Sequence, residues 1–186
     1  MVMKHKKPLS QDPAPILVEH FNALHCPKDK PILDIACGYG RNGAFFVDKG
    51  YKCCFCDIDP DCLKFIEEGV GVCENGSINK SLYKVYNIDF ENQEWPFAEN
   101  SASGIINVHY YNRDIIEKFI NTVCIGGFIY IETISARGMN YIDLPEYKYI
   151  YNIMKDKYEF IYYNEKIVKP VELSKATLKL LAIRKY

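Results

Sequence analysis

Residues 31–43, PILDIACGYGRNG, join a short apolar run to a carboxylate and three closely spaced glycines. The glycines are Gly38, Gly40 and Gly43, and Asp34 precedes the first of them by four residues. Glycine lets a backbone approach a ligand closely and adopts positive φ at little cost. A strand, a tight turn and a helix start in this order are typical of nucleotide-binding turns. The pattern therefore predicts a site for an adenosine-type cofactor.

A second carboxylate, Asp57, ends the next apolar run, YKCCFC. At the end of the second strand of a doubly wound sheet, a carboxylate accepts hydrogen bonds from ribose hydroxyls. The glycine spacing also satisfies the dinucleotide fingerprint literally, so NAD is an alternative at this point. However, Asp34 is poorly placed beside a pyrophosphate and well placed beside an ammonium or sulfonium group. Together with Asp89 at the end of the third strand and a terminal hairpin, this favours a cationic cofactor over NAD.

The end of the apolar run GIINVH offers a group for proton transfer. His109 is the first candidate for a general base, with Tyr110 or a water as alternatives. A packing role for the histidine is an equal alternative. We expect polar and aromatic side chains to shape the pocket for the acceptor, the molecule that would give up this proton. Arginines there favour an anionic or electron-rich group. These expected acceptor residues are Tyr39, Tyr110, Arg113, Arg137 and Tyr141.

Apolar runs alternate with helix signals along the chain, which predicts a three-layer α/β domain with a doubly wound, mostly parallel sheet. Asp59-Pro60-Asp61 is a helix start, and Gly50 is a helix stop. The two final runs are joined by a connection too short for a helical crossover, so they pair antiparallel. The seven expected strands begin near residues 32, 51, 82, 104, 128, 158 and 176, and the expected helices cover 41–49, 60–68, 114–123 and 149–154.

The N-terminal segment, residues 1–28, is expected to lie across the cofactor cleft as part of one domain that spans residues 1–186. Gln11-Asp12-Pro13 predicts the start of its helix. Apolar residues at helical spacing form one face of that helix. They are Ile16, Leu17, Phe21 and Leu24.

Composition narrows the function classes. With 186 residues, 23 basic and 24 acidic side chains, the formal net charge is −1, which gives no electrostatic case for nucleic acid as the main partner. No apolar stretch approaches the roughly 20 residues that span a bilayer, so we expect a cytoplasmic protein without a membrane partner. Four of the eight cysteines lie in or beside predicted strands, which favours core thiols over a metal site or disulfides.

Several motifs together carry a family resemblance. LDIACGYGRN, CDIDP, YNIDF, GGFIYIET and LLAIRK resemble those of class I S-adenosylmethionine-dependent methyltransferases. More narrowly, the GRN triplet, Asn112-Arg113, the VCIGGF turn and the YYNE to AIRK tail resemble the small tellurite-resistance-type methyltransferases. The resemblance covers the chain from about Pro31 to its end. It implies the Rossmann-like methyltransferase fold, with seven strands and an antiparallel C-terminal hairpin.

The resemblance also implies roles for individual residues. Asp34 orients the amino-acid part of S-adenosylmethionine, Asp57 binds the ribose hydroxyls, and Asp89 receives the adenine amine. Ile58 packs on the adenine, and the residues around His109 flank the sulfonium. The full set of implied cofactor residues is Asp34, Ala36, Cys37, Gly38, Tyr39, Gly40, Asp57, Ile58, Asp89, Phe90, Asn107, Val108 and His109.

Two positions depart from the common family pattern. Ile125 replaces a proline that often precedes the paired glycines, and Gly104 replaces an aspartate that often opens the fourth strand. The leading hypothesis is transfer of the sulfonium methyl group to a small-molecule acceptor by in-line displacement. Methylation of RNA or protein, and a non-catalytic regulatory subunit, are alternatives. The sequence identifies neither the acceptor atom nor the oligomeric state.

Overall fold

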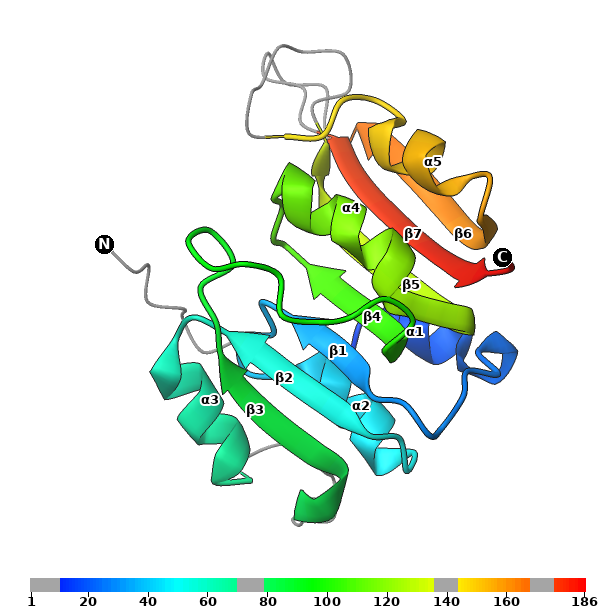
Figure 1. Cartoon of the computed structure of the whole chain (residues 1–186). Helices are drawn as coiled ribbons and strands as arrows, with labels where there is room; N and C mark the ends of the chain where they lie inside the picture. The colour runs from blue at the N-terminus through cyan, green and yellow to red at the C-terminus, as the bar shows by residue number, and fades with distance from the viewer. Residues whose placement is uncertain (1–10, 70–78, 136–143, 168–175) are drawn as a thin grey trace.

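The computed structural model describes residues 11–69, 79–135, 144–167 and 176–186. Its centre is a seven-stranded sheet in the order β3-β2-β1-β4-β5-β7-β6 (Figure 1). The expected α/β class, the mostly parallel sheet and the antiparallel C-terminal hairpin are confirmed. The strands are β1 (Ile32–Ile35), β2 (Cys53–Asp57), β3 (Tyr83–Asn87), β4 (Ala102–Val108), β5 (Val123–Ser135), β6 (Tyr158–Ile167) and β7 (Ala176–Arg184).

Parallel pairing brings the carboxyl ends of β1, β2 and β4 to one edge of the sheet. Ile35 of β1 is paired with Cys56 on one side and with Asn107 on the other. β2 pairs with β3 in the same direction as far as Asp57 and Asn87. The chain order reverses between β1 and β4, and ligands bind at such a switch point in open α/β sheets.

Helices cover both faces of the sheet. Figure 1 shows α4 and α5 on the near face, with α1 and α2 behind the strands. Buried Ile116 and Phe119 of α4 and Met154 of α5 pack on the near face, whereas Leu17 of α1 and Phe46 of α2 pack on the far face. Both faces of the central strands are therefore apolar. The helices are α1 (Pro15–Glu19), α2 (Arg41–Asp48), α3 (Pro60–Glu67), α4 (Arg113–Thr122) and α5 (Tyr149–Met154), with short 3-10 turns at Phe21–Ala23 and Lys80–Leu82.

Local signals explain where the helices begin. The side chain of Asp59 accepts a hydrogen bond from the Asp61 N–H, and Pro60 takes the first helical position of α3. The side chain of Asn112 accepts from the Ile115 N–H, so α4 begins one residue earlier than expected. Sequence signals at these caps therefore place the residues that follow β2 and β4.

The first helix differs from the expectation in extent and position. It begins at Pro15 rather than at Gln11, and it is followed by a separate 3-10 turn. Ile16 and Leu17 are buried against α2 and the far face of the sheet, where Leu24 also packs. Ile16, Leu17 and Leu24 of this segment thus belong to the core, residues 1–10 lie outside the described part, and a position of the segment across the cleft stays a prediction.

The paired glycines at residues 126 and 127 lie inside β5 rather than in a turn before it. β5 starts at Val123, and its pairing with β4 is irregular between Ala102 and Gly104. A Cβ on Gly127 would lie 2.7 Å from the Ser103 carbonyl oxygen. Close backbone approach therefore explains Gly127, and the strand begins earlier than its apolar run suggests.

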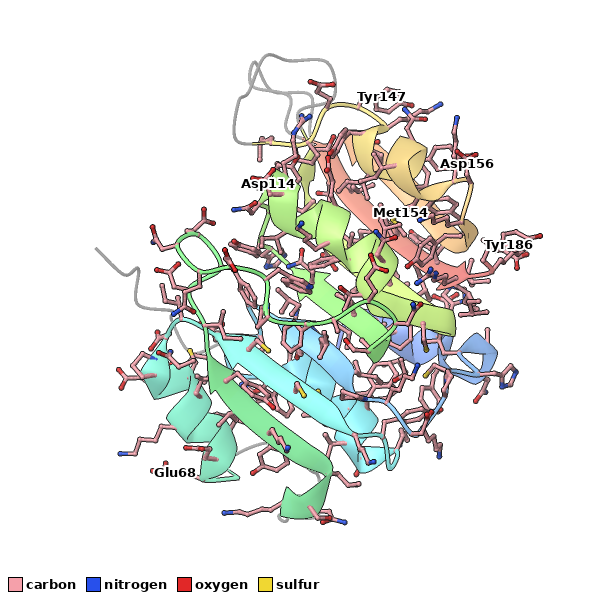
Figure 2. The ribbon with its side chains drawn as sticks, in the orientation of Figure 1. Glu68, Asp114, Tyr147, Met154, Asp156 and Tyr186 are labelled. Atoms are coloured by element: carbon pink, nitrogen blue, oxygen red, sulfur yellow. The ribbon has the colours of Figure 1, made fainter. Side chains whose placement is uncertain are left out.

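The C-terminal half forms the second wing of the sheet. β7 runs antiparallel to both β5 and β6 and lies between them. In Figure 2, Tyr147, Asp156 and Tyr186 lie at the periphery, in agreement with their exposure. Met154, the last residue of α5, lies further inward and is buried. Tyr151 stacks on Phe160 of β6, with ring centroids 4.7 Å apart. Aromatic packing thus fixes α5 to the outer strand.

Most of the described cysteines are core thiols. All seven described cysteines are free, and six of them are buried. Cys53 and Cys56 face opposite sides of β2, because residues three apart in a strand alternate: Cys53 packs beside α2 and α3, and Cys56 packs on the α4 side. Cys37 alone among the described thiols is partly accessible. None of the described helices is long and apolar enough to cross a membrane.

Candidate functional site

A cavity of about 500 Å³ opens at the carboxyl edge of the sheet, at the switch point between β1 and β4. It is built from the turns that follow β1, β2, β3 and β4. Eleven of its lining residues were expected to bind the cofactor, and Tyr110 was expected at the acceptor. The residues that line it are Asp34, Ala36, Cys37, Gly38, Tyr39, Arg41, Asn42, Asp57, Ile58, Ile88, Asp89, Phe90, Glu91, Val108, His109 and Tyr110.

Asp34 is a buried carboxylate in the wall of the cavity. One of its oxygens, Oδ2, accepts a hydrogen bond of 2.8 Å from the Gly43 N–H in the first turn of α2. Burial raises the pKa of Asp34 to about 7, against the effect of the Gly43 bond and with a further contribution from the charge of Asp57. Through its bond to Gly43, Asp34 also caps the first turn of α2. A positive ligand group beside it would stabilise the ionised form.

Asp57 holds the glycine turn in place. Its Oδ2 accepts from the Gly38 N–H at 2.7 Å, and its Oδ1 accepts from the Asp59 N–H at 2.9 Å. Gly38 has a φ of +52°, and no atom lies within 4 Å of a Cβ built there. The glycine is thus required by the backbone conformation, and its open face is turned to the cavity.

The turn after β3 forms the opposite end of the cavity. The side chain of Asp89 accepts from the Glu91 N–H at 3.0 Å and from Asn92 Nδ2 at 2.9 Å. The bond from Asn92, followed by that from Glu91, lowers the pKa of Asp89. Ile58, which also lines the cavity and whose carbonyl oxygen accepts from Asn87 at the end of β3, exposes 37% of its surface. A carboxylate beside an open apolar side chain suits a flat, amine-bearing ring.

Two lining residues have unusual backbone conformations. Ala36 has a φ of +51° and His109 has a φ of +64°, a region that residues with a Cβ seldom occupy. Such conformations cost energy and cluster at functional sites. They follow β1 and β4 directly, and they turn the chain sharply at the two strands that flank the switch point.

His109 lies at the other rim, beside an ionised cluster. Its N–H donates to the Glu132 carbonyl oxygen at 2.7 Å, and its Nε2 lies 3.9 Å from Glu132 Oε1. Lys179 Nζ lies 2.7 Å from Oε1, and the Tyr130 hydroxyl donates to Oε2 at 2.8 Å. Burial opposes ionisation of Glu132, but these hydrogen bonds outweigh it and lower the pKa of this carboxyl. The imidazole is largely exposed and accessible from the cavity.

Tyr110 is committed to a partner. Its hydroxyl donates to Glu91 Oε1 at 2.8 Å, and burial followed by Glu91 raises the pKa of Tyr110 above its ordinary value. A tyrosine base must first lose its proton, and this environment opposes that loss. His109 is therefore the better-placed base of the two candidates.

Three expected site residues do not line the cavity. Gly40 starts α2 with a φ of +73°, and a Cβ there would lie 2.8 Å from Ile66 Cδ1. Asn107 is fully buried, with its Nδ2 directed to the Ile35 carbonyl oxygen. The Arg113 guanidinium lies 4.3 Å from the centre of the Tyr149 ring and 3.7 Å from Glu146, at the surface. Arg137 and Tyr141 lie outside the described residues.

Four lining residues were not expected. Arg41 donates to the Asp12 carbonyl oxygen, and the Asn42 side chain accepts from the Ala14 N–H, so both join the cavity to the N-terminal segment. Ile88 and Glu91 flank the expected pair Asp89 and Phe90. Each of the four is next to a predicted residue or one position away, and this adjacency is the only sequence signal for them.

Comparison with known proteins agrees with this geometry. Residues 11–176 match the family described as tellurite resistance protein TehB. No curated protein sequence matches the chain at a significant level. The family match covers every described element from α1 to β6 and reaches only the first residue of β7, Ala176.

Solved structures share the fold. The crystal structure of TehB from Haemophilus influenzae superposes with a TM-score of 0.67 at 20% identity, covering 91% of this chain and 62% of that one. Geranyl diphosphate C-methyltransferase from Streptomyces coelicolor A3(2), in complex with Mg²⁺, geranyl diphosphate and S-adenosylhomocysteine, gives 0.67 at 11% identity, with 91% and 78% covered. A SAM-dependent methyltransferase from Methanosarcina mazei gives 0.62 at 16% identity, with 94% and 99% covered.

Proposed function

The chain belongs to the tellurite resistance protein TehB family, and from this premise we propose that it is an S-adenosylmethionine-dependent methyltransferase acting on a small molecule. The observation that carries the proposal is Asp34, a buried carboxylate whose pKa is raised to about 7. An unpaired buried carboxylate is costly unless a cation joins it. S-adenosylmethionine supplies such positive charge together with an electrophilic methyl group.

The lining residues fit the other parts of this cofactor. Asp57 lies at the glycine turn and accepts from the Gly38 N–H, so its carboxylate is placed to bind ribose hydroxyls. Asp89 and the exposed Ile58 suit adenine. Gly38 leaves room for close approach of the ligand to the backbone. Acids thus lie at both ends of the cavity.

The proposed mechanism needs no nucleophilic residue that bonds covalently to the methyl group. The protein binds, orients and excludes water, which suffices for in-line displacement at an activated carbon. Where the acceptor carries a proton, His109 Nε2, which lies 3.9 Å from Glu132 Oε1, takes it. The geranyl diphosphate bound by one structural neighbour supports a small-molecule acceptor, and the net charge of −1 gives no electrostatic case for nucleic acid.

Titration calorimetry tests the cofactor. We expect S-adenosylhomocysteine to bind and NAD to show no heat of binding. Labelled methyl from S-adenosylmethionine, incubated with a cell extract, should then appear in the low-molecular-mass fraction. Binding of NAD alone would contradict the cofactor assignment, and label found only in RNA or protein would contradict the small acceptor.

The role of His109 is tested separately. Once an acceptor is found, His109→Ala should slow single-turnover methyl transfer by about 10²- to 10⁴-fold while cofactor affinity stays within a few-fold. His20, which lies outside the cavity lining, supplies the matched control as His20→Ala. An unchanged rate in His109→Ala would remove the imidazole from catalysis.

A further inference from the structure

We propose that Glu91 is a positioning residue that joins the adenine side of the cavity to its acceptor side, so that cofactor affinity depends on it. The inference rests on the proposed function. Glu91 follows Asp89 and Phe90 in the turn after β3. Its partners Tyr110 and Asn112 belong to the segment after β4. Because β3 and β4 are not neighbours in the sheet, no strand pairing joins the ends of these two strands directly, and the carboxylate cross-links the segments that follow them.

Both carboxylate oxygens of Glu91 take part. Oε1 accepts from the Tyr110 hydroxyl at 2.8 Å, and Oε2 accepts from Asn112 Nδ2 at 3.2 Å. Asn112 is itself fixed, because its Oδ1 caps α4. Tyr110 follows His109 directly, so holding the tyrosine also holds the histidine rim. The cross-link therefore extends from the adenine turn to the start of α4.

The same turn fixes the adenine carboxylate. The Glu91 N–H donates to Asp89 Oδ1, and the Asp89 N–H donates to Gln93 Oε1 at 3.1 Å. Movement of the Glu91 backbone consequently moves the hydrogen-bonding group expected to receive the adenine amine. Glu91 thus acts through Asp89 on one side and through Tyr110 on the other.

Aromatic contacts run parallel to this polar link. The Phe90 ring lies 6.3 Å from the Tyr110 ring and 5.7 Å from the Trp95 ring, between centroids. Trp95 is the single tryptophan of the chain, and its Nε1 donates to the Thr122 hydroxyl at 2.9 Å. Its fluorescence therefore reports on the position of the adenine turn.

A second cavity, of about 670 Å³, lies behind the cross-link. It is bounded by the 91–99 segment and α4, and Phe90 and Glu91 line both cavities. Glu91 and its partners thus form the shared wall. Without the carboxylate, the adenine side would open to this second space and its solvent. Because Glu91 is exposed, its hydrogen bonds are screened and the expected effects are moderate.

Binding of S-adenosylhomocysteine tests the proposal without an acceptor. We expect Glu91→Ala to weaken the affinity about five- to twentyfold and to change the Trp95 fluorescence response. Glu91→Gln should restore part of the affinity, because its amide oxygen still accepts from Tyr110 while its NH2 group cannot accept from Asn112. Combining Glu91→Ala with Tyr110→Phe should cost little more than Glu91→Ala alone, since the two groups form one bond.

Glu94→Ala is the matched control, because Glu94 is a carboxylate of the same segment that lines only the second cavity. Its affinity should equal that of the unmodified chain, and melting temperatures verify that every variant folds. If Glu91→Ala bound S-adenosylhomocysteine as tightly as the unmodified chain, or if its effect and that of Tyr110→Phe were strictly additive, the proposed role of Glu91 would be overturned and the proposed function would stand. Failure of the unmodified chain to bind would instead overturn the proposed function and this inference with it.

Discussion

The two ends of the cavity carry the same chemical group in opposite electrostatic states. Asp34 is buried, accepts one backbone N–H, and has a pKa raised to about 7. Asp89 is at the rim, accepts hydrogen bonds from its own turn, and has a lowered pKa. The first carboxylate lacks charge compensation, whereas the second is satisfied before any ligand arrives. An aspartate at a strand end therefore reveals its role only through its surroundings.

This difference predicts which end dominates affinity for a cationic ligand. The end that lacks compensation gains most from the ligand, because a cation there relieves a desolvation cost already present in the fold. The satisfied end provides shape and a hydrogen-bond acceptor. Substitutions at the two ends should thus differ strongly in magnitude.

Removing the charge of Asp34 has the largest expected effect. In Asp34→Asn, the amide oxygen still accepts from Gly43, but the ligand ammonium loses its counter-charge. We expect the affinity for S-adenosylhomocysteine to fall about 100- to 1,000-fold, or about 3–4 kcal/mol. Calorimetry measures the change, and near-normal affinity would refute the assignment of Asp34 as the counter-charge.

The stability of the ligand-free protein should depend on pH through the same residue. The folded pKa of Asp34, about 7, lies above its unfolded value of 3.8, so the folded state holds an extra proton between these pH values. Stability therefore falls as pH rises from about 4 to 7, by about 2–4 kcal/mol, and then levels. Denaturant unfolding of Asp34→Asn should lack this decline, whereas equal pH profiles would contradict the raised pKa.

Gly43→Ala should displace the Asp34 side chain, because the added Cβ would crowd it from the side of α2. The added Cβ would lie 2.4 Å from Phe55 Cε1 and 2.9 Å from Asp34 Oδ2. We expect a loss of about 2 kcal/mol in stability, together with weaker cofactor binding. Gly104→Ala is the control, because its Cβ would meet the Phe128 ring at 2.3 Å, away from the cavity. We expect Gly104→Ala to be destabilised to a similar extent and to keep its affinity for the cofactor. Equal losses of affinity in the two variants would contradict a local effect of Gly43→Ala on Asp34.

Asp89→Asn should have the smallest effect. The neutral side chain keeps an oxygen for the adenine amine, and its charge is not needed to balance a cation. We expect the affinity for S-adenosylhomocysteine to fall only two- to fivefold by calorimetry. A loss as large as that of Asp34→Asn would show that the two ends do not differ in the manner described.

Much of the fold and part of the candidate site could be predicted from local sequence patterns. Apolar runs ending in Asp34 and Asp57, the turn at Gly38, and the cap at Asp59 are short-range signals, and each keeps its expected position. The start of β5 and the extent of α1 were not predicted correctly. There, pairing with β4 and packing against α2 override the local turn and cap signals.

The sequence by itself determined the order of strands and helices and the acids at the carboxyl ends of β1 and β2, because these depend on neighbours along the chain. Tertiary structure decided the rest. It placed the Arg113 guanidinium over the Tyr149 ring and the Asp34 carboxylate within hydrogen-bond distance of the Gly43 N–H. It also joined Glu91 to Tyr110, 19 positions further along the chain, by a hydrogen bond. Burial and pairing between distant segments set charge and orientation, and no local spacing encodes them.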